Sequence, residues 1–222
     1  AETQWQAARQ AAGVRVLGDL PFMISGDSPA VWARREQFML DATVGVPPDA
    51  FSETGQLWGN PLYHWPRLAA DGYRWWVERV RATLAQVDIV RIDHFRGFAG
   101  YWEIPASEPT AMRGQWKAGP GAAVFEAVSR ALGPMPVIAE DLGDIDDAVD
   151  ELREQAGFPG MRVLQFAFGS PAESAPAGGD ASSTNSKPDR SQLYLPENHI
   201  PDCVVYTGTH DNNTLVGWWA SL

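Results

Sequence analysis

The sequence predicts an α/β fold built on a parallel sheet. The first observation is a set of short apolar runs bounded by turn residues, at 14–22, 87–93, 135–143, 161–168 and 203–211. These runs lack the polar and apolar alternation of a strand with one exposed face, as expected for strands covered on both faces. The second observation is that helix-like segments lie between them, at 71–86, 120–133 and 144–157. Strands that alternate with helices indicate a parallel sheet.

The other segments are interpreted in chain order, within one domain over residues 1–222. Residues 1–13 predict a helix closed by Gly13. Residues 23–70 are rich in Pro, Gly and aromatic side chains, which favours a long, irregular, loop-rich functional excursion between the first two strands over a linker. Residues 169–192 are small and polar and contain no aromatic side chain, so we expect a disordered insertion there.

Composition and motifs argue against several classes of function. The 28 acidic and 17 basic residues give a net charge of -11, which opposes binding to nucleic acid or to an anionic membrane. Cys203 is the only cysteine, so no disulfide or cysteine zinc site is expected, and a cytoplasmic location is predicted. No run of about 18 apolar residues is present to span a bilayer. Dinucleotide, P-loop and HExxH motifs are absent, and no cofactor is implied.

Acidic residues end four of the predicted strands, and these residues are Asp19, Asp93, Glu140 and Asp211. Because parallel strands deliver their carboxyl ends to one edge of a sheet, we expect these side chains to converge there. The alternative for any single one is a helix N-cap or a solvated loop residue. Asp141 and Asp144 remain good cap candidates.

Two carboxylates that face each other suit the chemistry of a glycosidic bond, where one attacks and the other donates a proton. Arg91, two residues before Asp93, is expected to hold Asp93 ionised, while Glu140 between apolar neighbours is expected to stay protonated. Arg91 as a purely structural ion-pair partner is the alternative. His210 beside Asp211 suits either a metal or a sugar, and we predict no metal site.

Several segments together closely resemble the amylomaltase family, the 4-α-glucanotransferases or disproportionating enzymes of the α-amylase superfamily. They are GDLPFMISGDSPAVW, GVPPDAFSETGQLWGNPLY, VDIVRIDHFRGFAGYWEIPA, VIAEDLG, PGMRVLQFAF and YTGTHDNNT. The resemblance implies a (β/α)8 TIM barrel and a covalent glucosyl-enzyme intermediate. It also implies retaining transfer of α-1,4-glucan segments between maltooligosaccharides or starch-derived glucans, with no cofactor.

The resemblance also implies a role for each matching residue. Asp93 resembles the nucleophile, Glu140 the general acid/base and Asp211 the stabiliser of the transition state. The substrate-binding residues that we expect from the same motifs are Arg91, His210, Asp19, Asp49, Phe51, Trp58 and Asn60. The last four lie in a segment similar to the flexible loop that overhangs the bound glucan. For Trp58 the alternative is a place in the loop's own small core.

Two departures from the family pattern lead to further expectations. The stretch 169–192 is longer than the family's usual link, so residues 194–199 are expected to lie differently. The strands correspond to the third to seventh of the barrel, which makes the barrel incomplete. We therefore expect a crop of a longer protein, or a fragment that needs a partner, without transfer activity when it is alone. The alternatives are an α-amylase-like retaining glycoside hydrolase and a noncatalytic maltooligosaccharide-binding fragment.

Overall fold

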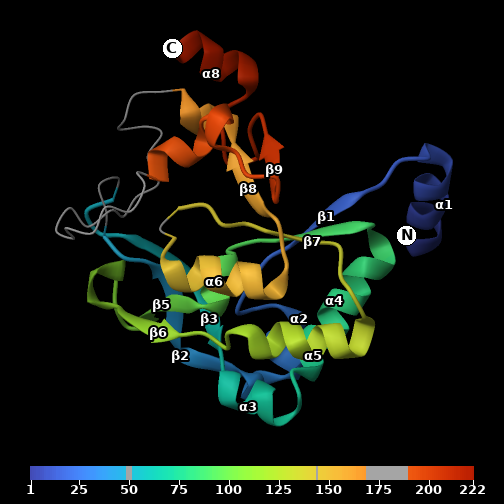
Figure 1. The fold of residues 1–222 in the computed structure, drawn as a ribbon. Helices are drawn as coiled ribbons and strands as arrows, with labels where there is room; N and C mark the ends of the chain where they lie inside the picture. The colour runs from blue at the N-terminus through green and yellow to red at the C-terminus, as the bar shows by residue number, and fades with distance from the viewer. Residues whose placement is uncertain (49–51, 144, 169–189) are drawn as a thin grey trace.

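The computed structural model describes residues 1–48, 52–143, 145–168 and 190–222, and it contains the predicted parallel strands (Figure 1). One parallel sheet has the order β1-β4-β7, formed by Leu17–Leu20, Ile89–Ile92 and Val137–Ala139. A second parallel pair joins β8 (Gly160–Val163) to β9 (Cys203–Tyr206). The five apolar runs and their parallel direction are thus confirmed. Within the described residues the two sheets do not join into a closed barrel.

The excursion at 23–70 is not irregular, and that expectation was wrong. It contains β2 (Phe38–Val46) and β3 (Gln56–Tyr63), which pair with β5 (Gly100–Pro105) and β6 (Gln115–Ala118) in an antiparallel sheet of order β3-β2-β5-β6. Its Pro and Gly residues are uncommon in strands, so the sequence pattern did not predict strands here. Pro61 lies in β3, an edge strand, where a missing N–H is tolerated. At Gly45 a Cβ would meet the Gln56 carbonyl oxygen at 2.1 Å, so the close β2–β3 approach requires glycine.

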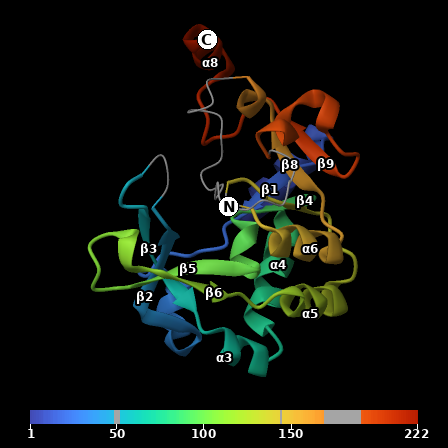
Figure 2. The ribbon, with the colours of Figure 1, turned by 60° about the vertical axis from the view of Figure 1, so that its left-hand side comes forward.

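The helices lie close to their predicted positions. Three of them, α4 (Arg74–Gln86), α5 (Ala122–Leu132) and α6 (Asp147–Ala156), pack side by side next to the β1-β4-β7 sheet (Figure 2). Shorter α-helices and 3-10 helices connect the strands: α2 Pro29–Ala33, α3 Trp65–Ala70, η1 Arg35–Gln37, η2 Phe95–Phe98, η3 Ala111–Arg113, η4 Leu164–Ala167 and η6 Pro196–Asn198.

The N-cap of α6 differs from the expectation. Asp146 caps α6 by accepting a hydrogen bond from the Val149 N–H at 3.1 Å. Asp144 lies outside the described residues. Asp141 is not a cap, because its side chain is buried among charged neighbours.

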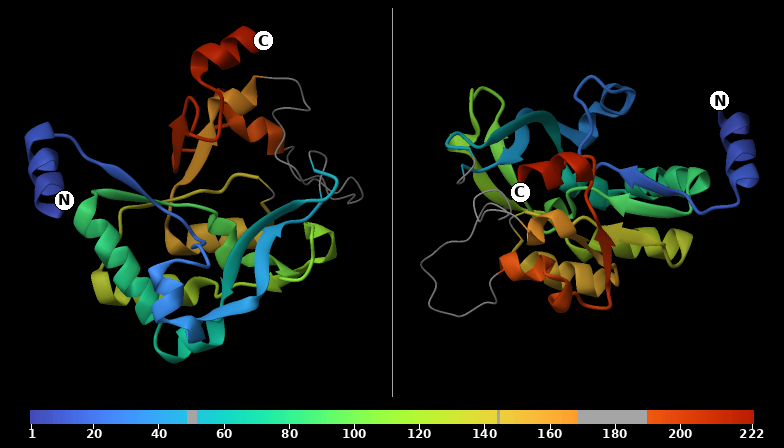
Figure 3. Two further views of the ribbon diagram at one scale, coloured as in Figure 1. Left: turned by 180° about the vertical axis from the view of Figure 1, so that it is seen from behind. Right: turned by 90° about the horizontal axis from the view of Figure 1, so that it is seen from above.

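The two ends of the chain lie apart from the body of the molecule (Figure 3). Helix α1 (Glu2–Ala12) projects at one end and is tied to α4 by Trp5 Nε1, which donates to the Gln86 carbonyl at 2.8 Å. Helix α8 (Leu215–Ser221) lies at the other end. The expected insertion at 169–192 falls outside the described residues up to residue 189, and Arg190–Tyr194 form η5. None of the described helices combines the length and apolar character needed to cross a bilayer.

An aromatic core supports the carboxyl ends of β1 and β4. Phe22, just after β1, contacts Phe98 and Tyr63 with ring centroids at 4.7 and 5.6 Å. Trp76 of α4 closes the same cluster at 5.0 Å from Phe98. All four side chains are at most 2% exposed. Because large buried rings are costly to displace, this core holds the ends of the two strands in place.

Candidate active site

Three of the predicted carboxylates lie at the end of one parallel sheet. Asp19 lies in β1, Asp93 follows β4 and Glu140 follows β7. The hydrogen-bond ladder continues beyond the strands, because the Asp93 N–H donates to the Leu20 carbonyl and the Glu140 N–H to the Ile92 carbonyl, each at 3.0 Å. The expected convergence of these three residues on one edge is confirmed.

Arg91 joins two of these carboxylates. Its Nη1 lies 2.6 Å from Asp19 Oδ1 and its Nη2 lies 2.8 Å from Asp93 Oδ1. The guanidinium side chain is only 7% exposed, whereas the carboxylates are 45% and 39% exposed. The ion pair of Arg91 with Asp93 was predicted, but the direction in which the pKa of Asp93 shifts was not. Burial raises the pKa of Asp93 above its ordinary value, and Arg91 only opposes that rise.

Glu140 has the properties of an acid that is protonated near neutral pH. Burial raises its pKa to about 7, and the nearby charge of Asp93 adds to the rise. Arg91 and two backbone donors act in the opposite direction. These donors are the His94 N–H, at 2.7 Å from Oε2, and the Leu142 N–H, at 2.8 Å from Oε1. The carboxyl group is therefore fixed at both oxygens.

Asp211 lies in the loop after β9, close to the same edge. Its charge makes the smallest of the contributions to the raised pKa of Asp93, so the two carboxylates lie within electrostatic range of each other. The side chains of Asp211 and His210 are 71% and 70% exposed, and His210 Nε2 lies 3.5 Å from Asp211 Oδ2. No group of three or more His, Cys, Asp or Glu side chains in the described part of the chain is placed to hold a metal ion.

Trp58 of β3 packs against His94, the residue that follows Asp93. Its ring lies 4.8 Å from the His94 ring at an interplanar angle of 75°. His94 directly follows Asp93, has a left-handed backbone with φ 49° and is half-buried. Burial lowers the pKa of its imidazole to about 3, so the ring is neutral. Trp58 therefore contacts the site and does not form a separate core within its own loop.

Of the other residues expected to bind substrate, only Asn60 is among the described residues, and its amide contacts the backbone of a neighbouring loop. Asn60 donates from Nδ2 to the Ile24 carbonyl at 3.0 Å and so holds the loop that follows β1. Asp49 and Phe51 lie outside the described residues.

Tyr206 was missed by sequence reasoning. It ends β9, and its buried hydroxyl has no hydrogen-bond partner among the described residues. Burial raises its pKa, while the charge of Arg91 lowers it and that of Asp19 raises it, so the hydroxyl lies within electrostatic range of that ion pair. Its position at the end of the apolar run CVVY is the signal that would have found it. The backbone donors of His94 and Leu142 leave no such signal.

Comparison with known proteins identifies the family of the chain. The model of the Glyco_hydro_77 family, described as 4-alpha-glucanotransferase, matches residues 1–222. The chain belongs to this 4-alpha-glucanotransferase family. The 4-alpha-glucanotransferase of Solanum tuberosum, described as chloroplastic/amyloplastic, is 46% identical over 230 residues that cover 100% of this chain and 37% of the relative. That of Synechocystis is 47% identical over 228 residues, covering 97% and 42%.

A solved structure supports the family fold. Amylomaltase from Streptococcus agalactiae in complex with acarbose superposes with a TM-score of 0.85 and is 36% identical, and the match covers 99% of this chain and 43% of that one. The fold is thus the mixed α/β fold of a glucanotransferase. The chain spans 37 to 43% of the length of these three relatives.

Proposed function

We propose that this chain carries the catalytic residues of a 4-α-glucanotransferase that moves α-1,4-glucan segments between maltooligosaccharides. The observation that carries the proposal is the contrast between two neighbouring carboxyl groups. Asp93 is paired with the Arg91 guanidinium, whereas desolvation of the half-buried Glu140 raises its pKa to about 7. A retaining reaction requires one carboxylate and one carboxylic acid beside the same bond.

The proposed reaction has two displacements. First, an Asp93 carboxylate oxygen bonds to the anomeric carbon as the bond from that carbon to the glycosidic oxygen breaks, and Glu140 gives its proton to the departing oxygen. Second, the 4-hydroxyl of an acceptor sugar attacks the same carbon, Glu140 takes up the hydroxyl proton, and Asp93 leaves as a carboxylate. Asp211 would hold hydroxyls of the reacting ring through its exposed carboxylate.

Substrate binding is proposed for the polar and aromatic groups at the same edge. Trp58, 36% exposed and in contact with His94, offers a ring face beside Asp93 on which a sugar would stack. Arg91, Asp19 and His210 would supply polar contacts to the sugar. The other substrate-binding residues that we propose are Asn60, Asp49 and Phe51. We further propose that the five parallel strands are the third to seventh of a (β/α)8 barrel, and that the protein is cytoplasmic.

The function is tested by incubating the full-length protein with maltotriose. Transfer releases glucose together with maltooligosaccharides longer than the substrate, whereas a hydrolase yields glucose and maltose without longer products. We expect the transfer pattern, and we expect Asp93→Asn to abolish it while maltooligosaccharide binding stays measurable by calorimetry. Hydrolysis alone, or transfer above one hundredth of the parent rate in the Asp93→Asn variant, would contradict the proposal.

A further inference from the structure

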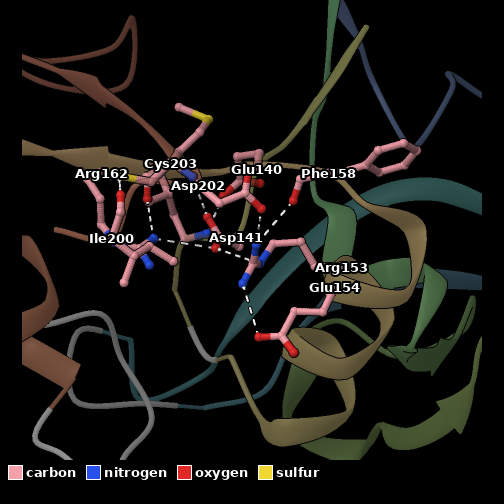
Figure 4. Close-up of polar contacts among 11 residues, drawn as sticks. Glu140, Asp141, Arg153, Glu154, Phe158, Arg162, Ile200, Asp202 and Cys203 are labelled. Atoms are coloured by element: carbon pink, nitrogen blue, oxygen red, sulfur yellow. Dashed lines mark hydrogen bonds and ion pairs between the residues drawn. The ribbon is translucent and has the colours of Figure 1, made fainter. Parts of the chain in front are cut away.

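A buried cluster of charged side chains lies directly behind the general acid (Figure 4). Its centre is Asp141, whose side chain is 3% exposed. Asp141 Oδ2 lies 3.5 Å from Arg153 Nε of α6 and 3.4 Å from Arg162 Nη1 of β8. Both guanidinium side chains are less than a tenth exposed, and Asp202 and Glu154 lie on the exposed rim of the cluster.

Asp141 spans the seam between the two parallel sheets. Backbone pairing joins β4 to β7 and β8 to β9, but β7 and β8 form no ladder with each other within the described residues. The end of β7 is joined to the residue before β8 by a backbone hydrogen bond from the Ala139 N–H to the Pro159 carbonyl at 2.9 Å. The Met161 N–H of β8 instead donates to Asp141 Oδ1 at 2.7 Å. A side-chain carboxylate thus takes the place of a strand carbonyl at this position.

The close packing around Asp141 shows how tightly the seam is fixed. A Cβ at Gly160 would lie 2.2 Å from Asp141 Oδ2 and 2.8 Å from its Cγ. Only glycine therefore lets the carboxylate reach the β8 backbone at its present position. Met161 also contacts the nucleophile's partner, because its Sδ lies 3.3 Å from Arg91 Nε. The seam therefore connects the surroundings of both catalytic carboxyl groups.

Asp141 lies between the general acid and one of the two donors that hold it. Glu140 precedes it, and Leu142, whose N–H donates to Glu140 Oε1 at 2.8 Å, follows it. If the Asp141 side chain is released from β8, the peptide that carries the Leu142 N–H is released with it. The orientation of the Glu140 carboxyl group then depends on the His94 N–H alone among its two backbone donors.

We propose that Asp141 is a positioning residue, which fixes the end of β7 to β8 and α6 so that Glu140 keeps the orientation needed for proton transfer. The inference rests on the proposed function, since it assumes that Glu140 is the general acid. Because proton transfer requires hydrogen-bond contact with the departing oxygen, a small misplacement of Glu140 slows reactions that depend on protonation. Reactions with a leaving group that departs without a proton are affected less.

Two variants test the role by different means. Asp141→Asn keeps the size of the side chain, but its amide NH2 cannot accept hydrogen bonds, so Asn cannot satisfy both Met161 and the two guanidiniums. Gly160→Ala keeps every charge and displaces the Asp141 carboxylate by contact. Asp88→Asn is the matched control, because Asp88 also accepts a backbone N–H, from Val16 at 2.7 Å, and pairs with Arg9 at 2.7 Å, but at the start of β4.

The assay compares kcat/KM of the full-length variants for α-maltotriosyl fluoride, which has an activated leaving group, and for maltotriose. General acid catalysis contributes about 10²–10⁴-fold. The ratio of interest is kcat/KM for the fluoride divided by kcat/KM for maltotriose. We therefore expect Glu140→Gln to raise this ratio by about 10² or more, and Asp141→Asn and Gly160→Ala to raise it by about tenfold. Asp88→Asn should leave it unchanged.

The outcomes separate the two proposals. An unchanged ratio in Glu140→Gln removes Glu140 as the general acid, and the positioning role falls with the proposed function. A raised ratio in Glu140→Gln, with parental ratios in the folded Asp141→Asn and Gly160→Ala variants, overturns the positioning role alone. If Asp141→Asn does not fold, Gly160→Ala decides the question, because its charges are intact.

Discussion

The raised pKa of Glu140 has a measurable cost in stability. Its pKa is 4.5 in an ordinary environment and about 7 in the folded protein, so between these values the folded state binds more protons than the unfolded state. Stability therefore falls as the pH rises through this window, by roughly 3 kcal/mol in total. Glu140→Gln removes the titration. The difference in unfolding free energy between the variant and the parent should thus shift by about 3 kcal/mol in favour of the variant between pH 4 and pH 8.

The stability of Glu140→Gln relative to the parent at pH 4 follows from the hydrogen bonds of the Glu140 carboxyl group. Both carboxyl oxygens of Glu140 accept backbone N–H groups, but a glutamine has only one oxygen, so one N–H loses its acceptor. This loss costs about 1–3 kcal/mol, and the variant should be the less stable protein at pH 4. Urea unfolding at a series of pH values measures the difference. Glu151→Gln, at an exposed position of α6, is the control and should stay within about 0.5 kcal/mol of the parent at each pH. A Glu140→Gln difference that moves by less than about 1 kcal/mol would refute the reasoning.

Two further predictions concern Arg91 and Gly97. Arg91 lowers the pKa of Asp93 against the effect of burial, so Arg91→Ala should move the acidic limb of kcat/KM to higher pH and lower kcat/KM by about 10². A pH profile for maltotriose tests this, and an unmoved acidic limb would speak against the ion pair's role. In Gly97→Ala the new Cβ would lie 2.4 Å from Phe22 Cε1, so we expect a loss of about 1–3 kcal/mol in urea unfolding. Gly26→Ala, whose Cβ would meet only Pro61 at 3.7 Å, is its control, and equal losses in the two variants would contradict the packing argument.

The sequence allowed the strands of the site to be predicted because each is a continuous apolar run that ends in charge. Strand β4 ends one residue before Asp93 and β7 ends directly before Glu140, as the runs predicted. The antiparallel sheet was missed for a physical reason. Its edge strand β3 contains Pro61, and β2 has two register shifts along β3, so neither strand shows a regular alternation.

The pair Glu140 and Asp141 marks the limit of what motif reading can assign. Successive side chains at the end of a strand point to opposite sides. Here the Glu140 carboxyl accepts the N–H of His94, next to Asp93, while the Asp141 carboxyl enters the packing between β7, β8 and α6. The sequence suggested a helix cap for Asp141, because it follows a strand and precedes a helix. It gave no sign of the two arginines that surround Asp141, since they come from later elements; Arg162 is 21 residues away. Two guanidiniums fix the buried Asp141 in place, whereas burial raises the pKa of Glu140 although Arg91 opposes the rise. Two adjacent acids thus acquire different properties from their neighbours in space. Under the role proposed for Glu140, we infer that proton transfer depends on the docking of β8 and α6 as much as on the motif around Glu140.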